Sequence, residues 1–109
     1  MTGKPVLLRQ RAVRDADEAL EYYFAEGGRS AALGFVGALE KAYAHIARYP
    51  DSGSLRYAHD LNLPGLRSWP LKRFPYLVFY VVQPGNVDVW RVLHAGRDIP
   101  VWMGESDGV

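Results

Sequence analysis

The stretch RFPYLVFYVVQPGNVDVWRVLHAGRD, residues 73–98, contains two apolar segments separated by a Pro-Gly pair. Tyr76–Val82 is apolar at every position, which is typical of a strand that lies at the centre of a sheet or is covered on both faces. Val87–His94 is the second segment. Because Pro84 fixes φ at about −65°, the favoured two-residue hairpin turns are not available between them. We therefore predict two strands joined by a longer loop over Gln83–Asn86.

The second of these strands carries apolar residues on both faces. Side chains alternate along a strand, so parity predicts which residues share a face. One face is predicted to carry Val87, Val89, Arg91 and Leu93, and the other Asp88, Trp90, Val92 and His94. Since neither set is polar, the pattern does not show which face of the sheet carries helices.

Upstream, the chain changes from a short strand pattern to helical spacing. Lys4–Arg11 alternates in part and predicts a first strand. A helix is expected to start between Arg11 and Asp15, because an apolar stripe follows at spacings i, i+3, i+7, i+10 and i+11. That stripe is formed by Val13, Ala16, Leu20, Tyr23 and Phe24.

Gly27-Gly28 is expected to end the first helix. A second helix, with its own apolar stripe, is expected to follow and to end at Pro50. The short glycine-rich connection makes the two helices antiparallel neighbours. Leu66–Leu71 predicts a further strand, placed at an edge or an end because Pro70 cannot donate to a ladder. The expected fold is α+β, in the order β-α-α-β-β-β, with a helical hairpin packed on a mainly antiparallel sheet. We predict one domain over residues 1–109.

Composition narrows the class of protein further. The chain has 109 residues, an apolar fraction of 49% and a formal net charge of +1, so no strong overall field draws it to nucleic acid or to a membrane. It contains no cysteine, which suits a reducing compartment. The longest apolar run is shorter than a spanning helix requires. These features predict a cytoplasmic protein.

Sequence motifs exclude several kinds of site. His45, His59 and His94 are scattered and no cysteine can join them, so no metal site is expected. Neither of the common phosphate-binding glycine motifs is present, and no cofactor is expected. Asp15 and Asp17 are interpreted as favourable charges at the start of a helix.

A cationic group at one end of the predicted sheet is the remaining candidate site. Arginine and histidine hold phosphates and move protons, and they are also ordinary contacts for an acidic protein. Solvated strand ends are the simpler explanation of the same pattern. The candidate residues are Arg67, Arg73, Arg91, His94 and Arg97.

The order of these motifs resembles the ParE branch of the RelE/ParE toxin superfamily, the plasmid stabilisation toxins of type II toxin–antitoxin operons. The resemblance covers about Val6 to Trp102. It rests on a strand, a helical hairpin closed by Tyr49-Pro50, the stretch FPYLVFYVV and the ending VWRVLHAGRD. It implies a RelE/ParE-like fold.

The superfamily combines two activities. RelE-type members are ribosome-dependent mRNA endonucleases that use basic residues on the sheet, and Arg91, His94 and Arg97 are the residues that would serve here. Leu77, Ser68 and Pro70 stand where such nucleases carry cations, and Trp102 has no ionisable proton. These departures favour the ParE activity, which is inhibition of DNA gyrase without catalytic residues. A member kept as an interaction module, with neither activity, is the third alternative.

The resemblance also implies protein partners. ParE toxins are bound by a ParD-type antitoxin, whose helix lies along the toxin and whose own dimer makes the complex at least a heterotetramer. Tyr22 and Tyr23 are adjacent on a helix and cannot both point inward. With Trp102 they are the residues expected to bind the antitoxin, since Tyr and Trp anchor interfaces. DNA gyrase is the expected target; neither a membrane nor sequence-specific binding of nucleic acid by the chain alone is expected.

Overall fold

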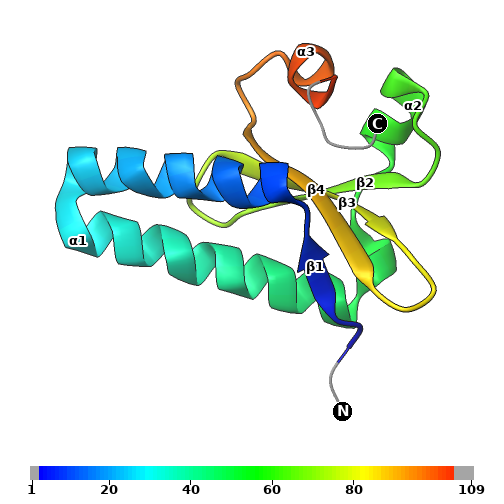
Figure 1. Ribbon diagram of the computed structural model, residues 1–109, viewed down its shortest axis with the longest axis horizontal. Coiled ribbons are helices and arrows are strands. Elements are labelled where there is room, and N and C mark those ends of the chain that lie inside the picture. Colours follow the sequence, from blue (N-terminus) through cyan, green and yellow to red (C-terminus); the bar gives the residue numbers. More distant parts are fainter. Residues whose placement is uncertain (1–2, 105–109) are drawn as a thin grey trace.

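The computed structural model describes residues 3–104; residues 1–2 and 105–109, which the predicted domain includes, lie outside that range. The secondary structure confirms an α+β fold with a helical hairpin on a four-stranded sheet (Figure 1). The elements are β1 (Val6–Leu8), α1 (Gln10–Arg48), the 3-10 helix η1 (Pro50–Ser52), α2 (Arg56–Leu61), β2 (Leu66–Pro70), β3 (Tyr76–Val82), β4 (Val87–His94) and α3 (Ile99–Met103).

The long element α1 is the predicted hairpin of two helices. Its two arms run antiparallel (Figure 1), and the break between them is Gly28, at φ 74° and ψ −165°. Only glycine adopts this backbone conformation readily. The second arm ends at Arg48, directly before Tyr49-Pro50, because proline cannot continue a helix.

The N-terminal boundaries differ from the prediction. The strand predicted over Lys4–Arg11 is confined to Val6–Leu8, where it pairs with β4. The Arg9 N–H still donates to the Val89 carbonyl at 2.9 Å, but its backbone is the extended N-cap of α1. The helix therefore begins at Gln10, and no acidic residue lies in its first turn. The interpretation of Asp15 and Asp17 as charges at the helix start was wrong for this reason.

The sheet has the order β1-β4-β3-β2, with β1 parallel to β4 and the other pairs antiparallel. The predicted bounds of β3 and β4 are confirmed. β3 lies between two neighbours, as its apolar sequence predicts. β2 lies at the edge, and Pro70 is its last residue, where no ladder donor is lost.

A β-bulge in β4 overturns the predicted alternation of faces. Arg91 pairs with Phe79 and Val89 pairs with Tyr80, so Trp90 is an extra residue on this strand. An extra residue reverses the alternation beyond it. The prediction that Val87, Val89, Arg91 and Leu93 share one face is therefore wrong after Val89. The core under α1 instead contains Val87, Val89 and Val92, whereas Leu93 packs in the opposite core.

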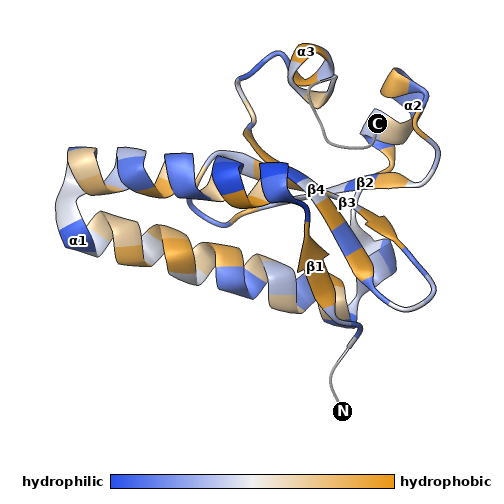
Figure 2. Ribbon diagram, in the orientation of Figure 1, coloured by the Kyte–Doolittle hydropathy of each residue, from blue (hydrophilic) through white to orange (hydrophobic). Residues whose placement is uncertain are grey.

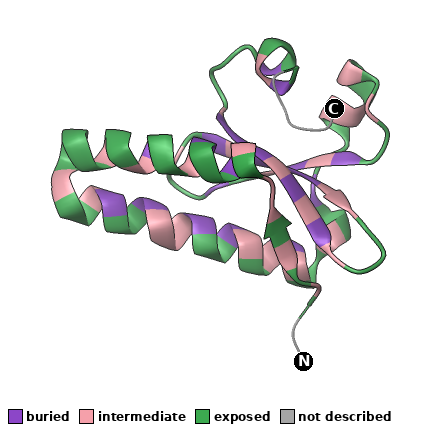
Figure 3. Cartoon of the chain, viewed as in Figure 1, coloured by how far each residue is buried: buried purple, intermediate pink, exposed green. Residues whose placement is uncertain are grey.

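Two apolar cores cover the two faces of the sheet. The larger core lies under the α1 hairpin and includes Phe35, Ile46, Val78 and Tyr80. The smaller core lies on the other face, where residues of α2 and α3 cover Leu66, Phe79 and Leu93. Figures 2 and 3 show apolar and buried positions on the strands and on the second arm of α1, whereas the first arm shows mostly hydrophilic and exposed positions in this view. The α1 hairpin therefore packs on the face of β3 that carries Tyr76, Val78 and Tyr80.

The short helices α2 and α3 were not predicted. α2 has six residues and α3 five, which is too short for an apolar stripe to repeat. Within residues 3–104, no helix has the combination of length and apolar character that crossing a membrane requires.

Candidate functional site

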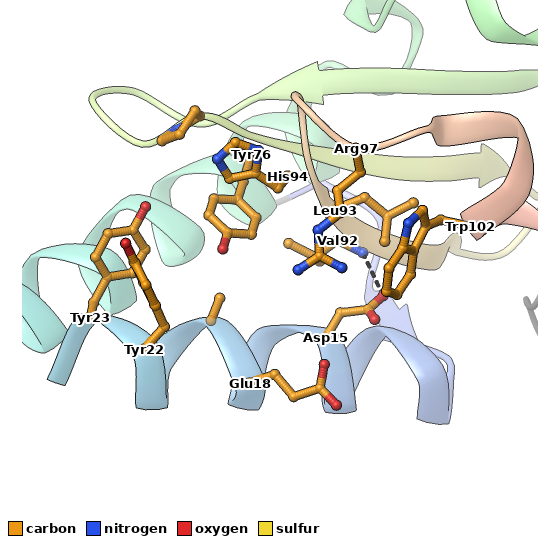
Figure 4. Close-up of a pocket in the computed structure, with 12 residues that line it drawn as sticks. Asp15, Glu18, Tyr22, Tyr23, Tyr76, Val92, Leu93, His94, Arg97 and Trp102 are labelled. Carbon is orange, nitrogen blue, oxygen red and sulfur yellow. Dashed lines mark hydrogen bonds between the residues drawn. The ribbon is translucent and has the colours of Figure 1, made fainter. Parts of the chain in front are cut away.

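A hollow of about 450 Å³ opens between the first arm of α1, the start of β3, the end of β4 and α3 (Figure 4). Its lining contains aromatic rings together with charges of both signs. The lining residues are Asp15, Glu18, Ala19, Tyr22, Tyr23, Pro75, Tyr76, Val92, Leu93, His94, Arg97 and Trp102.

This hollow brings together residues predicted for two different partners. Tyr22, Tyr23 and Trp102 are the residues expected to bind the antitoxin, and all three line it. His94 and Arg97, expected to bind the target, line the same hollow, across from Tyr22 and Tyr23, with Trp102 beside Arg97 (Figure 4). The sequence alone did not indicate that the two sets are neighbours.

The tyrosine wall of the hollow is part buried and part exposed. Tyr22 is 57% exposed, whereas Tyr23 packs between Phe35 and Phe74, with ring centroids 5.2 and 5.0 Å away. The two adjacent tyrosines therefore differ in exposure, as their helical spacing predicts. Burial raises the pKa of Tyr23, and the neighbouring Tyr76 and Tyr22 raise it further. The Tyr23 phenol therefore stays protonated, as a hydrogen-bond donor, at neutral pH.

His94 and Arg97, on the side of the hollow opposite the two tyrosines, are each held in place by a contact with a neighbouring residue. The Gly96 N–H donates to His94 Nδ1 at 2.9 Å, so a neutral His94 ring carries its proton on Nε2. The ring meets Tyr76 edge-on at 5.2 Å. The Arg97 guanidinium lies over the Trp102 ring, 4.2 Å from its centroid. Such a cation–π contact holds the Arg97 charge beside the hollow.

Arg91 lies in the interior and does not contribute to the surface of the hollow. Its side chain is fully buried, and Nε donates to Asp15 Oδ2 at 2.6 Å. Nη1 donates to the Trp102 carbonyl at 2.6 Å. The expectation that Arg91 belongs to an exposed cationic surface therefore does not hold in this structure. Its role is to join α1, β4 and α3 around the hollow.

The other two predicted cations lie elsewhere. Arg67 Nη1 donates to the Asp51 and Gly53 carbonyls, both at 2.9 Å, and so fixes the segment around η1. Arg73 is exposed in the connection between β2 and β3, at φ 72°. Of the five residues predicted for target binding, His94 and Arg97 are the two that line this hollow.

Glu18 and Tyr76 line the hollow although the sequence analysis did not assign them to a site. Helical spacing is the signal that identifies Glu18, because Asp15, Glu18 and Tyr22 follow at i, i+3 and i+7 and share one face of the helix. Tyr76 was noted only as part of an apolar strand and of the stretch FPYLVFYVV. Among the described residues, no group of three His, Cys, Asp or Glu side chains is arranged to hold a metal ion.

Comparisons with known proteins agree with this architecture. A family model described as the ParE toxin of the type II toxin-antitoxin system parDE matches residues 6–99. The chain is also similar to a solved structure described as a chromosomal ParDE TA system from P. aeruginosa, with a TM-score of 0.70 and 20% sequence identity. The similarity covers 84% of this chain and 95% of that chain, and at this identity it is a similarity of fold. No curated protein sequence matches the chain.

Proposed function

The chain belongs to the ParE family of toxins of type II toxin–antitoxin systems, and from this premise we propose that it arrests growth by binding DNA gyrase. We further propose that a ParD-like antitoxin neutralises it. The observation that carries the proposal is the hollow, which is aromatic, exposed at Tyr22, and bordered by the cation Arg97. Aromatic and arginine side chains at an accessible hollow are typical of the centre of a protein interface.

Target and antitoxin share this surface in our proposal. His94 and Arg97 contact the target, while Tyr22, Tyr23 and Trp102 anchor the antitoxin. Since all five line one hollow of about 450 Å³, the two partners cannot occupy it together. Neutralisation is then direct competition for the same side chains. The antitoxin's own dimer gives a complex of at least two toxins and two antitoxins.

The nuclease alternative is less well supported by the geometry. Of its three expected residues, Arg91 is buried in an ion pair with Asp15 and is not accessible to RNA. Leu77 packs against the smaller core, and Ser68 is a buried residue of β2, so neither position offers a cation to phosphate. The geometry therefore favours binding of a protein target.

Regulated expression in bacterial cells tests the proposed function. Expression of the chain is expected to stop growth, to induce the DNA-damage response and to give filamentous cells, because trapped gyrase leaves broken DNA. Transcript ends mapped in the same cells test the alternative. Cuts that follow the codon period and appear only with the toxin would identify the nuclease instead. Co-expression of the protein encoded next to the toxin gene is expected to restore growth.

A further inference from the structure

A second hollow, of about 440 Å³, lies between the second arm of α1 and the end of β2. It shares no lining residue with the first hollow. Ala42 and Leu71 are buried at its base, and Trp69 forms a half-buried wall. Lys41 and Lys72 are exposed at its rim. We refer to these residues, together with His45, as the lysine groove.

The aromatic wall of the lysine groove is held in place by its own contacts. The rings of His45 and Trp69 stack with centroids 3.9 Å apart and planes 14° apart. The Ser52 hydroxyl donates to the Tyr49 carbonyl at 2.7 Å, so its proton is already used. His45 Nε2, 3.0 Å from Ser52 Oγ, must therefore be the donor in that contact. A wall fixed in this way binds a partner without first losing side-chain freedom.

The charges around the groove are of one sign. Lys41 and Lys72 are the charged side chains that line it, and no carboxylate is among the lining residues. The apolar base favours a partner's apolar side chain, while the two exposed lysines favour carboxylates beside it. A basic or neutral partner gains nothing from this rim. The groove is therefore complementary to an acidic amphipathic peptide.

We propose that the lysine groove binds an acidic amphipathic segment of the antitoxin, as a second contact separate from the first hollow. An apolar side chain lies against Ala42 and Trp69, and flanking carboxylates lie at Lys41 and Lys72. The identity of this occupant rests on the proposed function, whereas the chemistry of the groove does not. Contacts at two sites strengthen binding of one partner, because the second contact forms within the same complex.

A model peptide tests the chemistry independently of the antitoxin. The probe is an acetylated amphipathic helix with leucine on one face and glutamate on the other, added to the ¹⁵N-labelled full chain. The three indole N–H signals report on separate surfaces: Trp69 on the groove, Trp102 on the first hollow, and Trp90, bonded to Asp88, on the far face. We expect the Trp69 signal to move while the Trp90 signal stays in place.

Matched controls separate charge-dependent recognition from nonspecific apolar binding. The same peptide with glutamine for glutamate, and the variant Lys41→Glu/Lys72→Glu with the original peptide, are each expected to bind about tenfold more weakly. Arg14→Glu/Arg29→Glu changes the net charge equally at exposed α1 positions outside the groove and should bind like the wild type. A Trp69 signal that does not move overturns the proposal, and so does equal binding of the glutamine peptide or of the groove variant.

Co-expression with the natural antitoxin distinguishes the two proposals. If the antitoxin protects cells from the Lys41→Glu/Lys72→Glu toxin as well as from the wild type, the groove proposal is wrong and the proposed function stands. If the model peptide binds the groove but the antitoxin neither binds nor protects, the chemistry of the groove stands, whereas the antitoxin is wrong both as its occupant and as the neutralising partner in the proposed function. Antitoxin protection that is weaker against the Lys41→Glu/Lys72→Glu toxin than against the wild type supports both proposals.

Discussion

The Arg91 guanidinium and the Asp15 carboxylate form two hydrogen bonds in the interior, Nε to Oδ2 at 2.6 Å and Nη2 to Oδ1 at 2.8 Å. The same carboxylate accepts the Val92 N–H at 3.1 Å, beyond the part of β4 that pairs with β1. Arg91 also bonds the Trp102 carbonyl. One buried ion pair therefore links the first arm of α1 to β4 and α3, the elements that surround the first hollow.

Removing either partner of this pair is expected to destabilise the protein strongly. Arg91→Met leaves the Asp15 charge buried without its partner, which typically costs about 3–5 kcal/mol. The double variant Asp15→Leu/Arg91→Met leaves no charge behind and should lose less than the sum of the two single variants. Urea unfolding measures all three, with exposed Arg14→Met as a control expected to stay within about 0.5 kcal/mol of the wild type. Additive single and double values would contradict this account of the pair.

The break between the two arms of α1 predicts opposite effects for two glycines. Gly28→Ala puts a Cβ on a backbone at φ 74° and should cost about 1–3 kcal/mol, although nothing lies within 4 Å of that Cβ. Gly37, in the second arm, also has open space where a Cβ would lie, but its backbone is regular helix. Gly37→Ala should therefore stabilise by about 0.5–1 kcal/mol. Thermal unfolding of both variants checks the prediction. Equal changes in stability would mean that alanine at position 28 causes no backbone strain.

Two tyrosine hydroxyls in the interior predict contrasting results for the same substitution. The Tyr80 hydroxyl donates to the Pro50 carbonyl at 2.7 Å and accepts the Gly53 N–H at 3.0 Å. Tyr80→Phe should cost about 1–3 kcal/mol, because it leaves buried backbone groups unpaired. The buried Tyr43 hydroxyl has no hydrogen-bond partner among the described residues. Tyr43→Phe should therefore change the unfolding free energy by less than about 1 kcal/mol at neutral pH.

Tyr43 also predicts how stability changes at alkaline pH. Burial, and then the nearby Asp15 charge, raise its pKa well above the ordinary value of 10.0. When the pH is below that ordinary pKa, the Tyr43 hydroxyl keeps its proton in both the folded and the unfolded state, so the full stability is present. Above it the unfolded state ionises first, so stability falls as the pH rises toward the folded pKa. The Tyr43→Phe variant should lose less stability than the wild type between neutral and strongly alkaline pH, as measured by urea unfolding across that range.

The sequence predicted the parts of the fold that are set by local patterns. β3, β4 and the hairpin follow from apolar periodicity, Gly28 and Pro50, all of which act over a few residues. The bulge at Trp90 left no signal, because both faces of β4 are apolar. The Arg91–Asp15 pair spans 76 residues, and without the fold each side chain had a simpler explanation as a surface charge. Five of the twelve residues that line the first hollow were candidate site residues in the sequence, but their assembly from α1, β4 and α3 depends on that long-range pair.

Variants in the first hollow are expected to separate toxicity from stability. Arg97 is exposed and held over Trp102, so Arg97→Gln should change the unfolding free energy by less than about 1 kcal/mol. If Arg97 contacts the target, the same variant should lose growth inhibition. Arg29→Gln, at the exposed turn of α1, removes the same charge and should remain toxic. Growth curves with matched expression levels, together with thermal unfolding, check both properties; full toxicity of Arg97→Gln would remove this residue from the target surface.

The supercoiling reaction of purified DNA gyrase tests the central claim most directly. We predict that the purified wild-type chain inhibits supercoiling or causes cleaved DNA to accumulate, that Arg97→Gln does neither, and that added antitoxin restores the reaction. Unaltered gyrase activity in the presence of a chain that is folded and stops growth in cells would contradict the proposed target.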